Sequence, residues 1–427
     1  MSSFLALCAI GCETVVSNEL KKNGFAPFDR TCGGVFFSSN APLLTTMFKA
    51  NYFLRTVDRV LLVLAKQQAC DFDSFFDIIT TIEWEAYFHK DAKIIVEKVS
   101  TFKSRLASEH TLQAMAHKAI CSRLCSLWHV HSLKSNTENE QKVRLYLNHD
   151  ELCVCLDTSG CPLYKRGYRL KGGLAPLRET VATTLLHLMQ WKRKYPLHDG
   201  FAGSGTILIE ALYYALNIPP SLNRNFAFEH FSMFDHPSII ETISSIKEKA
   251  MKGVRTDCNV RISGSDISPS AVSLANANIE RACTLAGKEL SQYGISHHII
   301  RPEVTLTSFE DLQLAENDGM LISNLPYGKR VMEQDNVLDL YENIAKKIAG
   351  FQQEGKNWQM GFLTDKEELK SILQKQTSSL IPRNKVQTRK KQTRSLKPQS
   401  IIKKQAVKEG NIQTYFFWLD ARLIDKS

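Results

Sequence analysis

Long hydrophobic runs are missing from this sequence, and no apolar stretch approaches the roughly 18 to 20 residues that a membrane-spanning helix needs. The first 18 residues also lack the Lys or Arg that a secretory signal carries ahead of its apolar segment. We therefore predict no membrane span. The apolar residues 4–10 favour an opening strand over the alternative, a lipoprotein signal that ends before Cys12.

Metal-ligand patterns are missing as well. The eleven cysteines form no CxxC pair and no Cys/His cluster at zinc spacing. Their odd number and irregular spacing, in a chain of 427 residues that can bury a core without crosslinks, predict reduced thiols. We expect a cytoplasmic protein without a bound metal.

Positive charge is in excess, and it is concentrated. The formal net charge is +10. Residues 383–408 contain ten Lys and Arg and no acid, which leaves 44 of the 54 basic residues to balance the 44 acidic ones. Residues 165–194 are a second basic stretch, with Glu179 as their single acid. A solvated loop is one explanation of such runs, but contact with a polyanion is the explanation we favour.

The length predicts two or three domains, and the first 157 residues predict mixed α and β structure. Residues 1–60 form a small α+β unit in this interpretation. Residues 61–157 add further strands and helices, and they end in a hairpin that turns at His149 and Asp150. A polar insert at residues 134–141 is expected to lie outside the strands.

From about residue 175, apolar strands alternate with helices of roughly 10 to 17 residues, which predicts βαβ units and a parallel sheet. The fold class is therefore α/β. The first expected strand ends with residues 197–199, and the others lie at 260–263, 320–323 and 358–363. Helices are expected at 204–217, 269–286 and 336–350. Residues 411–419 have an aromatic, period-two pattern and predict a terminal antiparallel strand.

A glycine-rich loop, DGFAGSGT at residues 199–206, joins the first of these strands to a helix. Gly203 and Gly205 allow the backbone to approach a ligand, and the free N–H groups of the helix point at it. No Lys follows the glycines, so the loop is not a P-loop, and the third glycine of the dinucleotide fingerprint is missing. By itself the loop is a weak signal for a nucleotide-like cofactor.

Asp266 closes the next strand, and Ser268 and Pro269 form an N-cap and first-turn pair for the following helix. An acid at this strand end can accept hydrogen bonds from both hydroxyls of a ribose. A simple turn residue is an equally good interpretation of Asp266 taken alone.

The sequence SNLPYG at residues 323–328 follows a third strand and carries the most information. An exocyclic base amine is a poor nucleophile because its lone pair is delocalised into the ring. The Asn324 side-chain oxygen and the Leu325 carbonyl can accept its two N–H bonds, and Pro326 holds Leu325 extended. Tyr327 offers a ring on which the base can stack, worth about 1–3 kcal/mol.

Three such motifs at consecutive strand ends resemble the class I S-adenosylmethionine-dependent N-methyltransferases. The resemblance implies a Rossmann-like domain with S-adenosylmethionine as cofactor. The cofactor-binding residues that it implies are Asp199, Phe201, Gly203, Gly205, Asp266, Ser308 and Asn324, with Asp311 as the alternative to Ser308. The implied catalytic residues are Asn324, Leu325, Pro326 and Tyr327.

Two upstream segments, LYKRGYR at 163–169 and APLRET at 175–180, look like those of bacterial guanine-N2 methyltransferases of 23S ribosomal RNA. The N-terminal part resembles that family's ferredoxin-like and THUMP domains. The resemblance implies a ferredoxin-like domain at 1–60, an RNA-binding THUMP domain at 61–160, a methyltransferase domain at 165–427 and RNA as the partner. The RNA-binding residues that we nominate are Lys165, Arg166, Arg169, Arg389, Lys390, Lys391 and Arg394.

The chain departs from the family pattern at residues 200–202, at Ser308 and at Leu325, where proline is usual. Three alternatives stay open. One is a guanine-N2 methyltransferase of tRNA, which shares these domains, and another is DNA adenine methylation. The third is a non-catalytic RNA-binding or assembly factor on the same scaffold, and it is the one that the departures favour. The sulfonium is already a good leaving group, so the protein mainly supplies alignment, for which roughly 7–11 kcal/mol is available.

Overall fold

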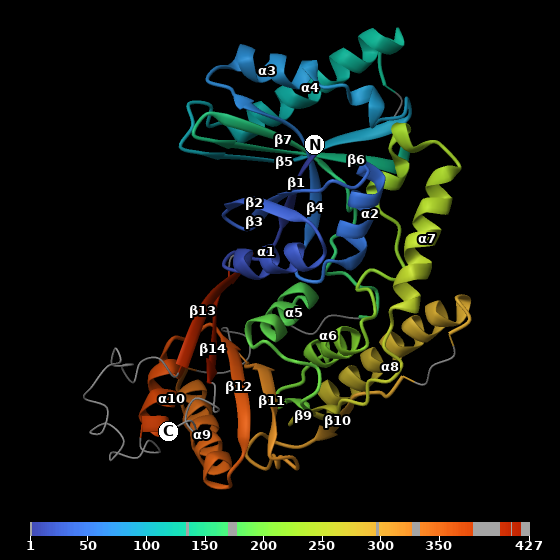
Figure 1. The fold of residues 1–427 in the computed structure, drawn as a ribbon. Helices are drawn as coiled ribbons and strands as arrows, with labels where there is room; N and C mark the ends of the chain where they lie inside the picture. The colour runs from blue at the N-terminus through green and yellow to red at the C-terminus, as the bar shows by residue number, and fades with distance from the viewer. Residues whose placement is uncertain are drawn as a thin grey trace, which may run out of the picture. The chain divides into compact units, whose positions relative to one another are not determined.

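The computed structural model describes residues 2–133, 136–169, 177–295, 299–326, 334–378, 402–410 and 412–419 (Figure 1). The chain divides into two compact units. Unit 1 comprises Met1–Cys8, Val16–Lys165 and Pro220–Ala250, and unit 2 comprises Ala9–Val15, Arg166–Pro219 and Met251–Ser427. No helix within the described ranges is long and apolar enough to cross a membrane.

Unit 1 is built on a seven-stranded sheet with the order β2-β3-β1-β4-β7-β6-β5 (Figure 1). Its neighbours pair antiparallel except for β5 and β6, which are parallel. The strands are β1 (Ser3–Leu7), β2 (Ala26–Thr31), β3 (Gly34–Ser38), β4 (Arg59–Gln68), β5 (Ala92–Phe102), β6 (Asn136–Asn148) and β7 (Glu151–Asp157). The predicted boundary near residue 60 falls on β4, which pairs with β1 on one side and β7 on the other.

The N-terminal helices are α1 (Glu13–Lys22), α2 (Leu43–Phe53), α3 (Phe72–Thr81) and α4 (Glu109–Trp128), with a short 3-10 helix η1 (Trp84–Ala86). Helix α3 begins at a capping box, in which Ser74 N–H donates to the Asp71 carboxylate at 2.8 Å. Helices α3 and α4 pack on each other, and α4 packs on β5. Helix α4 can pack on β5 because alternate residues of that strand are buried, so that one face of the strand belongs to the core.

The hairpin prediction is confirmed, because His149 and Asp150 adopt φ values of 52° and 63° between β6 and β7. The prediction of a polar insert at residues 134–141 was wrong. Strand β6 begins at Asn136, and its main chain pairs with β5, for example Glu140 with Lys93. A ladder between main-chain groups does not require apolar side chains, and the Lys93 and Glu140 side chains form an ion pair of 2.7 Å.

Unit 1 also contains a segment from the second half of the sequence. It comprises η2 (Ala227–His230), η3 (Ser232–Phe234) and most of α7 (Ser238–Lys252). The rings of Phe226 and Phe231 are buried, and they meet Phe48 and Tyr87 edge-on at 5.9 and 5.7 Å between centroids. The sequence pattern did not predict this aromatic contribution to the core of unit 1.

Unit 2 holds a second seven-stranded sheet, with the order β10-β9-β8-β11-β12-β14-β13. Strands β10 to β12 are parallel, and β14 is antiparallel to both neighbours. The strands are β8 (Leu197–Asp199), β9 (Ile262–Asp266), β10 (Glu303–Leu306), β11 (Asp318–Asn324), β12 (Asn357–Thr364), β13 (Ile402–Glu409) and β14 (Ile412–Leu419). The helices are α5 (Glu179–Leu188), α6 (Thr206–Ala215), α8 (Pro269–Gln292), α9 (Gln334–Gln353) and α10 (Glu368–Ser378).

The strand order reverses between β8 and β11, since β9 and β10 lie on one side of β8 while β11 and β12 lie on the other. In an open parallel sheet such a switch point opens a crevice at the carboxyl ends of the strands. All three sequence motifs lie at carboxyl ends, of β8, β9 and β11. The predicted α/β fold with a parallel sheet is confirmed.

Strands β10 and β13 and helices α7 and α10 were not predicted. Strand β13 occupies residues at the end of the basic stretch 383–408, where a loop or polyanion contact was expected. Its pairing with the aromatic strand β14 explains the difference, since the Lys404 Nζ lies 4.1 Å from the centroid of the Tyr415 ring.

Candidate functional site

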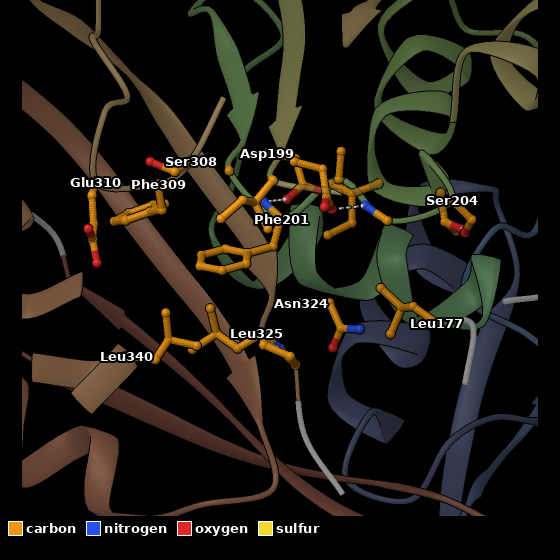
Figure 2. A pocket seen from close by; sticks show the side chains of 18 residues that line it. Leu177, Asp199, Phe201, Ser204, Ser308, Phe309, Glu310, Asn324, Leu325 and Leu340 are labelled. Carbon is orange, nitrogen blue, oxygen red and sulfur yellow. Dashed lines mark hydrogen bonds between the residues drawn. The ribbon is translucent and has the colours of Figure 1, made fainter. Parts of the chain in front are cut away.

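A cavity of about 520 Å³ lies in unit 2 at the carboxyl ends of β8, β9 and β11 (Figure 2). The predicted site residues that line it are Asp199, Phe201, Gly203, Asp266, Ser308, Asn324, Leu325 and Pro326. Gly205 does not line it but precedes the first residue of α6. Tyr327 falls outside the described residues. Sequence reasoning therefore found residues that the fold brings to one cavity.

The glycine loop needs its glycines for two different reasons. Gly205 has a φ of 77°, and a Cβ there would lie 3.3 Å from the Ala275 Cβ, so helices α6 and α8 pack closely at this point. At Gly200 the reason is space, because a Cβ would lie 2.6 Å from Cδ2 of Phe309. The loop thereby presents main chain to the cavity.

Asp266 ties the glycine loop to β9. Its Oδ2 accepts the Gly203 N–H at 2.9 Å, and its Oδ1 accepts the Ser268 N–H at 2.9 Å. Ser268 is the N-cap of α8, as predicted. Each carboxylate oxygen retains a lone pair, and the side chain is partly exposed on the cavity wall. The arrangement fits a ligand with neighbouring hydroxyls.

Asp199 is the most deeply buried acid of the site, at 1% exposure. Burial is the main reason why its pKa rises to about 7, and the nearby Asp266 charge adds to this rise. The Phe201 N–H, which donates to Asp199 Oδ1 at 3.1 Å, opposes it. The carboxyl therefore changes charge near neutral pH.

His198 precedes Asp199 in β8 and is buried. Its two ring nitrogens are 2.9 Å from Ser263 Oγ and 3.2 Å from Ser265 Oγ, both on β9. Burial lowers the pKa of this imidazole to about 4, so the ring is neutral at physiological pH. It joins β8 to β9 and does not line the cavity.

Asn324 ends β11 with an unused acceptor. Its Oδ1 is buried and has no hydrogen-bond partner among the residues that the structure describes. The next residue is fixed in place, because the Leu325 N–H donates to the Leu363 carbonyl of β12 at 2.9 Å. A buried acceptor without a partner costs free energy unless a ligand donates to it. The site is therefore suited to a ligand that carries an N–H or O–H group.

Phe309 and Glu310 are among the cavity residues that the sequence did not predict. The ring of Phe309 stacks on Phe201, with centroids 5.2 Å apart. Ser308, the predicted residue, and Glu310 both line the cavity. Ser308 donates its hydroxyl to Asp311 Oδ2 at 2.6 Å, and Glu310 Oε1 accepts from the Asn343 amide at 2.8 Å. The sequence offered one signal for Glu310, because it is an acid that lies between the two candidate positions, Ser308 and Asp311.

The nominated RNA-binding residues separate into three groups. Lys165 is exposed. The Arg166 side chain is fully buried 3.7 Å from Glu210, and Arg169 lies 3.1 Å from Glu179. Because both guanidinium groups face carboxylates inside unit 2, the structure does not support phosphate contacts by them. Arg389, Lys390, Lys391 and Arg394 lie outside the described residues.

The polar groups that line the cavity can form hydrogen bonds with an organic ligand. They are two aspartates, a glutamate, hydroxyls and an amide. In the part of the chain that the structure describes, no cluster of three or more His, Cys, Asp or Glu residues could hold an ion. The polar groups of the cavity therefore fit a ligand with hydroxyl and amine groups.

Known proteins resemble both parts of the chain. A family model described as "RMKL-like, methyltransferase domain" matches residues 166–394, and one described as "RlmL ferredoxin-like domain" matches residues 3–61. YpsC of Bacillus subtilis (strain 168), provisionally named an RNA methyltransferase, is 31% identical over 372 residues, which are 86% of this chain and 88% of YpsC.

The ribosomal RNA large subunit methyltransferase K/L of Shewanella oneidensis is 29% identical over 376 residues, or 87% of this chain. This chain spans only 50% of that relative. Among solved structures, SMU.472, a provisionally named methyltransferase in complex with SAH, matches with a TM-score of 0.77 and 26% identity. That match covers 98% of this chain and 97% of SMU.472.

Proposed function

The chain belongs to the family of RMKL-like methyltransferases, and on that premise we propose that it methylates RNA with S-adenosylmethionine, at the N2 amine of a guanine in large-subunit ribosomal RNA. Relatives named for RNA methylation support the reaction and the substrate class. The choice of guanine N2 and of 23S RNA rests on the resemblance of residues 163–169 and 175–180 to guanine-N2 methyltransferases of 23S ribosomal RNA.

The cavity fits S-adenosylmethionine, which supplies a methyl group on a positively charged sulfur. Asp266 has lone pairs for the ribose hydroxyls, and the stacked Phe201 and Phe309 rings give an apolar surface for the adenine. The main chain at Gly203 and the start of α6 approach the ligand without obstructing side chains. The cofactor-binding roles of Asp199, Phe201, Gly203, Asp266 and Ser308 are part of this proposal.

The Oδ1 of Asn324, to which no residue of the described ranges donates, is the observation that carries the proposal. In the mechanism it accepts one N–H of the exocyclic amine, and the Leu325 carbonyl accepts the other. These bonds draw the nitrogen lone pair out of conjugation and aim it at the methyl carbon. The pairing of Leu325 N–H with Leu363 holds this short segment rigid, so alignment is established before the base arrives.

Two experiments test the proposal. Purified 23S RNA and tRNA from cells that lack the protein are incubated with it and with labelled cofactor, and the methylated nucleosides are identified by mass spectrometry. N2-methylguanosine in 23S RNA is the expected product. The same nucleoside in tRNA alone would move the substrate to tRNA, and methylated adenine in DNA would change the substrate class. Cofactor binding without transfer to any nucleic acid would instead indicate an assembly factor.

A further inference from the structure

A cluster of buried charges lies in unit 2 beside the cavity, and the proposed mechanism makes no use of it. It consists of Arg166, Arg169, Glu179 and Glu210. Each carboxylate oxygen of Glu210 accepts one hydrogen bond, from the Tyr168 hydroxyl at 3.0 Å and from the Thr183 hydroxyl at 2.8 Å. Burying charged groups costs free energy unless ion pairs and hydrogen bonds compensate for the lost hydration. The contacts of each member therefore show what the cluster holds in place.

Arg169 is the member that reaches the cavity wall. Its Nη2 donates to the Leu177 carbonyl at 2.8 Å and to Thr206 Oγ1 at 3.0 Å. The same nitrogen lies 3.1 Å from Glu179 Oε1, the first residue of α5. One amino group therefore joins the chain before α5, the start of α5 and the start of α6.

Two of these partners, Leu177 and Thr206, line the cavity. Figure 2 shows Leu177 and Ser204 on one side of Asn324, with Phe309 and Glu310 on the other. The Ser204 hydroxyl is 3.0 Å from Thr206 Oγ1, so the hydrogen bonds continue from Arg169 into this wall. Asp266 and the Phe201–Phe309 pair are assigned to the nucleoside, which leaves the Leu177 side for the amino-acid part of the cofactor.

We propose that Arg169 is a positioning residue for the cofactor: it fixes Leu177 and Thr206 at the end of the cavity opposite Glu310, where the anionic carboxylate of the cofactor binds. This inference rests on the proposed function. It adds that Arg169 holds in place the end of the cavity that binds the cofactor carboxylate. Arg169 acts through Thr206, whose position at the N-terminus of α6 is where unpaired N–H groups favour an anion.

Arg169 makes all three contacts through one terminal nitrogen, Nη2. A lysine ammonium also carries three N–H donors, but its shorter and more flexible stem can restore these contacts only in part. Glu179 keeps the guanidinium in place. Burial is the main reason that the pKa of Glu179 rises to about 7, with Arg169 opposing the rise.

The test uses the full-length protein and measures its affinity for S-adenosylhomocysteine by calorimetry, the KM for cofactor and for RNA, and the thermal midpoint. Arg169→Met should weaken cofactor-product binding about tenfold and raise the KM for cofactor, while the KM for RNA changes less than about twofold. Arg169→Lys should recover only part of the loss.

Arg193→Met is the matched control, because Arg193 is also half-buried in unit 2 but contacts the other end of α6. Its Nη1 donates to the Tyr214 carbonyl at 3.4 Å and its guanidinium stacks on the Tyr214 ring. This variant should keep the wild-type affinity.

A double-mutant cycle separates positioning from a general structural role. Thr206→Val alone should weaken binding about fivefold, and in the Arg169→Met background it should add less than about twofold, because the two residues act as one unit. Additive losses, or equal losses in Arg169→Met and Arg193→Met, would overturn the inference. A wild-type protein that binds the product but methylates no RNA would refute the proposed function and leave this comparison valid.

Discussion

The ring of Phe201 stacks on the ring of Phe309, with the planes inclined at 22° and the centroids 5.2 Å apart. Phe309 also occupies the space that a side chain at Gly200 would need. The loop after β8 and the segment after β10 are thus packed together at the cavity, although more than 100 residues separate them in the sequence.

A methyl group at position 200 should disturb this packing. In Gly200→Ala the new Cβ would lie 2.6 Å from Phe309, so we expect a loss of about 1–3 kcal/mol in the free energy of unfolding and weaker cofactor binding. Denaturant titration and calorimetry measure both. Gly287→Ala is the control, because nothing lies within 4 Å of that position in α8, and a helical alanine should be neutral or stabilising. Equal behaviour of the two variants would contradict the packing argument.

The unpaired acceptor predicts a loss of catalysis without a loss of cofactor. Asn324→Ala should lower kcat by about 100- to 1,000-fold, since a pre-oriented dipole at the reacting amine is removed. The dissociation constant for S-adenosylhomocysteine should change less than about threefold. Asn276→Ala removes an amide elsewhere in unit 2 and should keep full activity. Parallel loss of turnover and cofactor binding in Asn324→Ala would indicate a structural role instead.

Asp199 predicts a pH dependence of stability. The pKa of this carboxyl is about 7 in the folded protein and 3.8 ordinarily, so the folded state holds the extra proton between these values. The free energy of unfolding therefore falls as the pH rises from 3.8 to about 7, and above about pH 7 it falls no further on account of this carboxyl. Asp199→Asn cannot ionise. Relative to wild type, it should gain about 2 kcal/mol in unfolding free energy between about pH 5 and pH 8.

Urea titrations at several pH values measure this difference. Glu179, whose pKa is also raised to about 7, and His198, whose pKa is lowered to about 4, are present in both proteins and cancel. A stability difference that stays constant across this pH range would show that Asp199 is ionised in the folded state throughout.

The basic residues predict a salt dependence that distinguishes two kinds of arginine. Replacing Arg389, Lys390, Lys391 and Arg394 by alanine should flatten the plot of log affinity for RNA against log salt, by about 0.7 for each single-strand phosphate that is no longer neutralised. Arg166→Met should leave the slope unchanged, because that side chain is buried against Glu210. Filter binding at salt concentrations from about 50 to about 300 mM gives both slopes.

The cavity could be predicted from the sequence because its residues follow a local rule. Asp199, Asp266 and Asn324 each end a parallel strand, and parallel strands present their carboxyl ends at one edge. Glu310 and Phe309 escaped prediction because they follow a strand, β10, that is only four residues long and has one buried position.

Burial of charge was harder to predict. Arg166 and Arg169 belong to a stretch rich in positive charge, which favours a solvated surface or a polyanion. Their partners, Glu210 and Glu179, come from helices α6 and α5, and only the tertiary fold brings them within 4 Å. The strand β6 illustrates the same limit, since main-chain pairing with β5 overrides a polar sequence.

The phenylalanines at 226, 228 and 231 have a consequence for biosynthesis. They belong to the core of unit 1, yet the ribosome makes them after α5 and α6. The core of unit 1 is therefore complete only after about residue 250 has been synthesised. A fragment that ends at residue 165 should be prone to aggregate, because it lacks these three rings. Expressing residues 1–165 and 166–427 as separate proteins would divide the core of unit 1 between two chains.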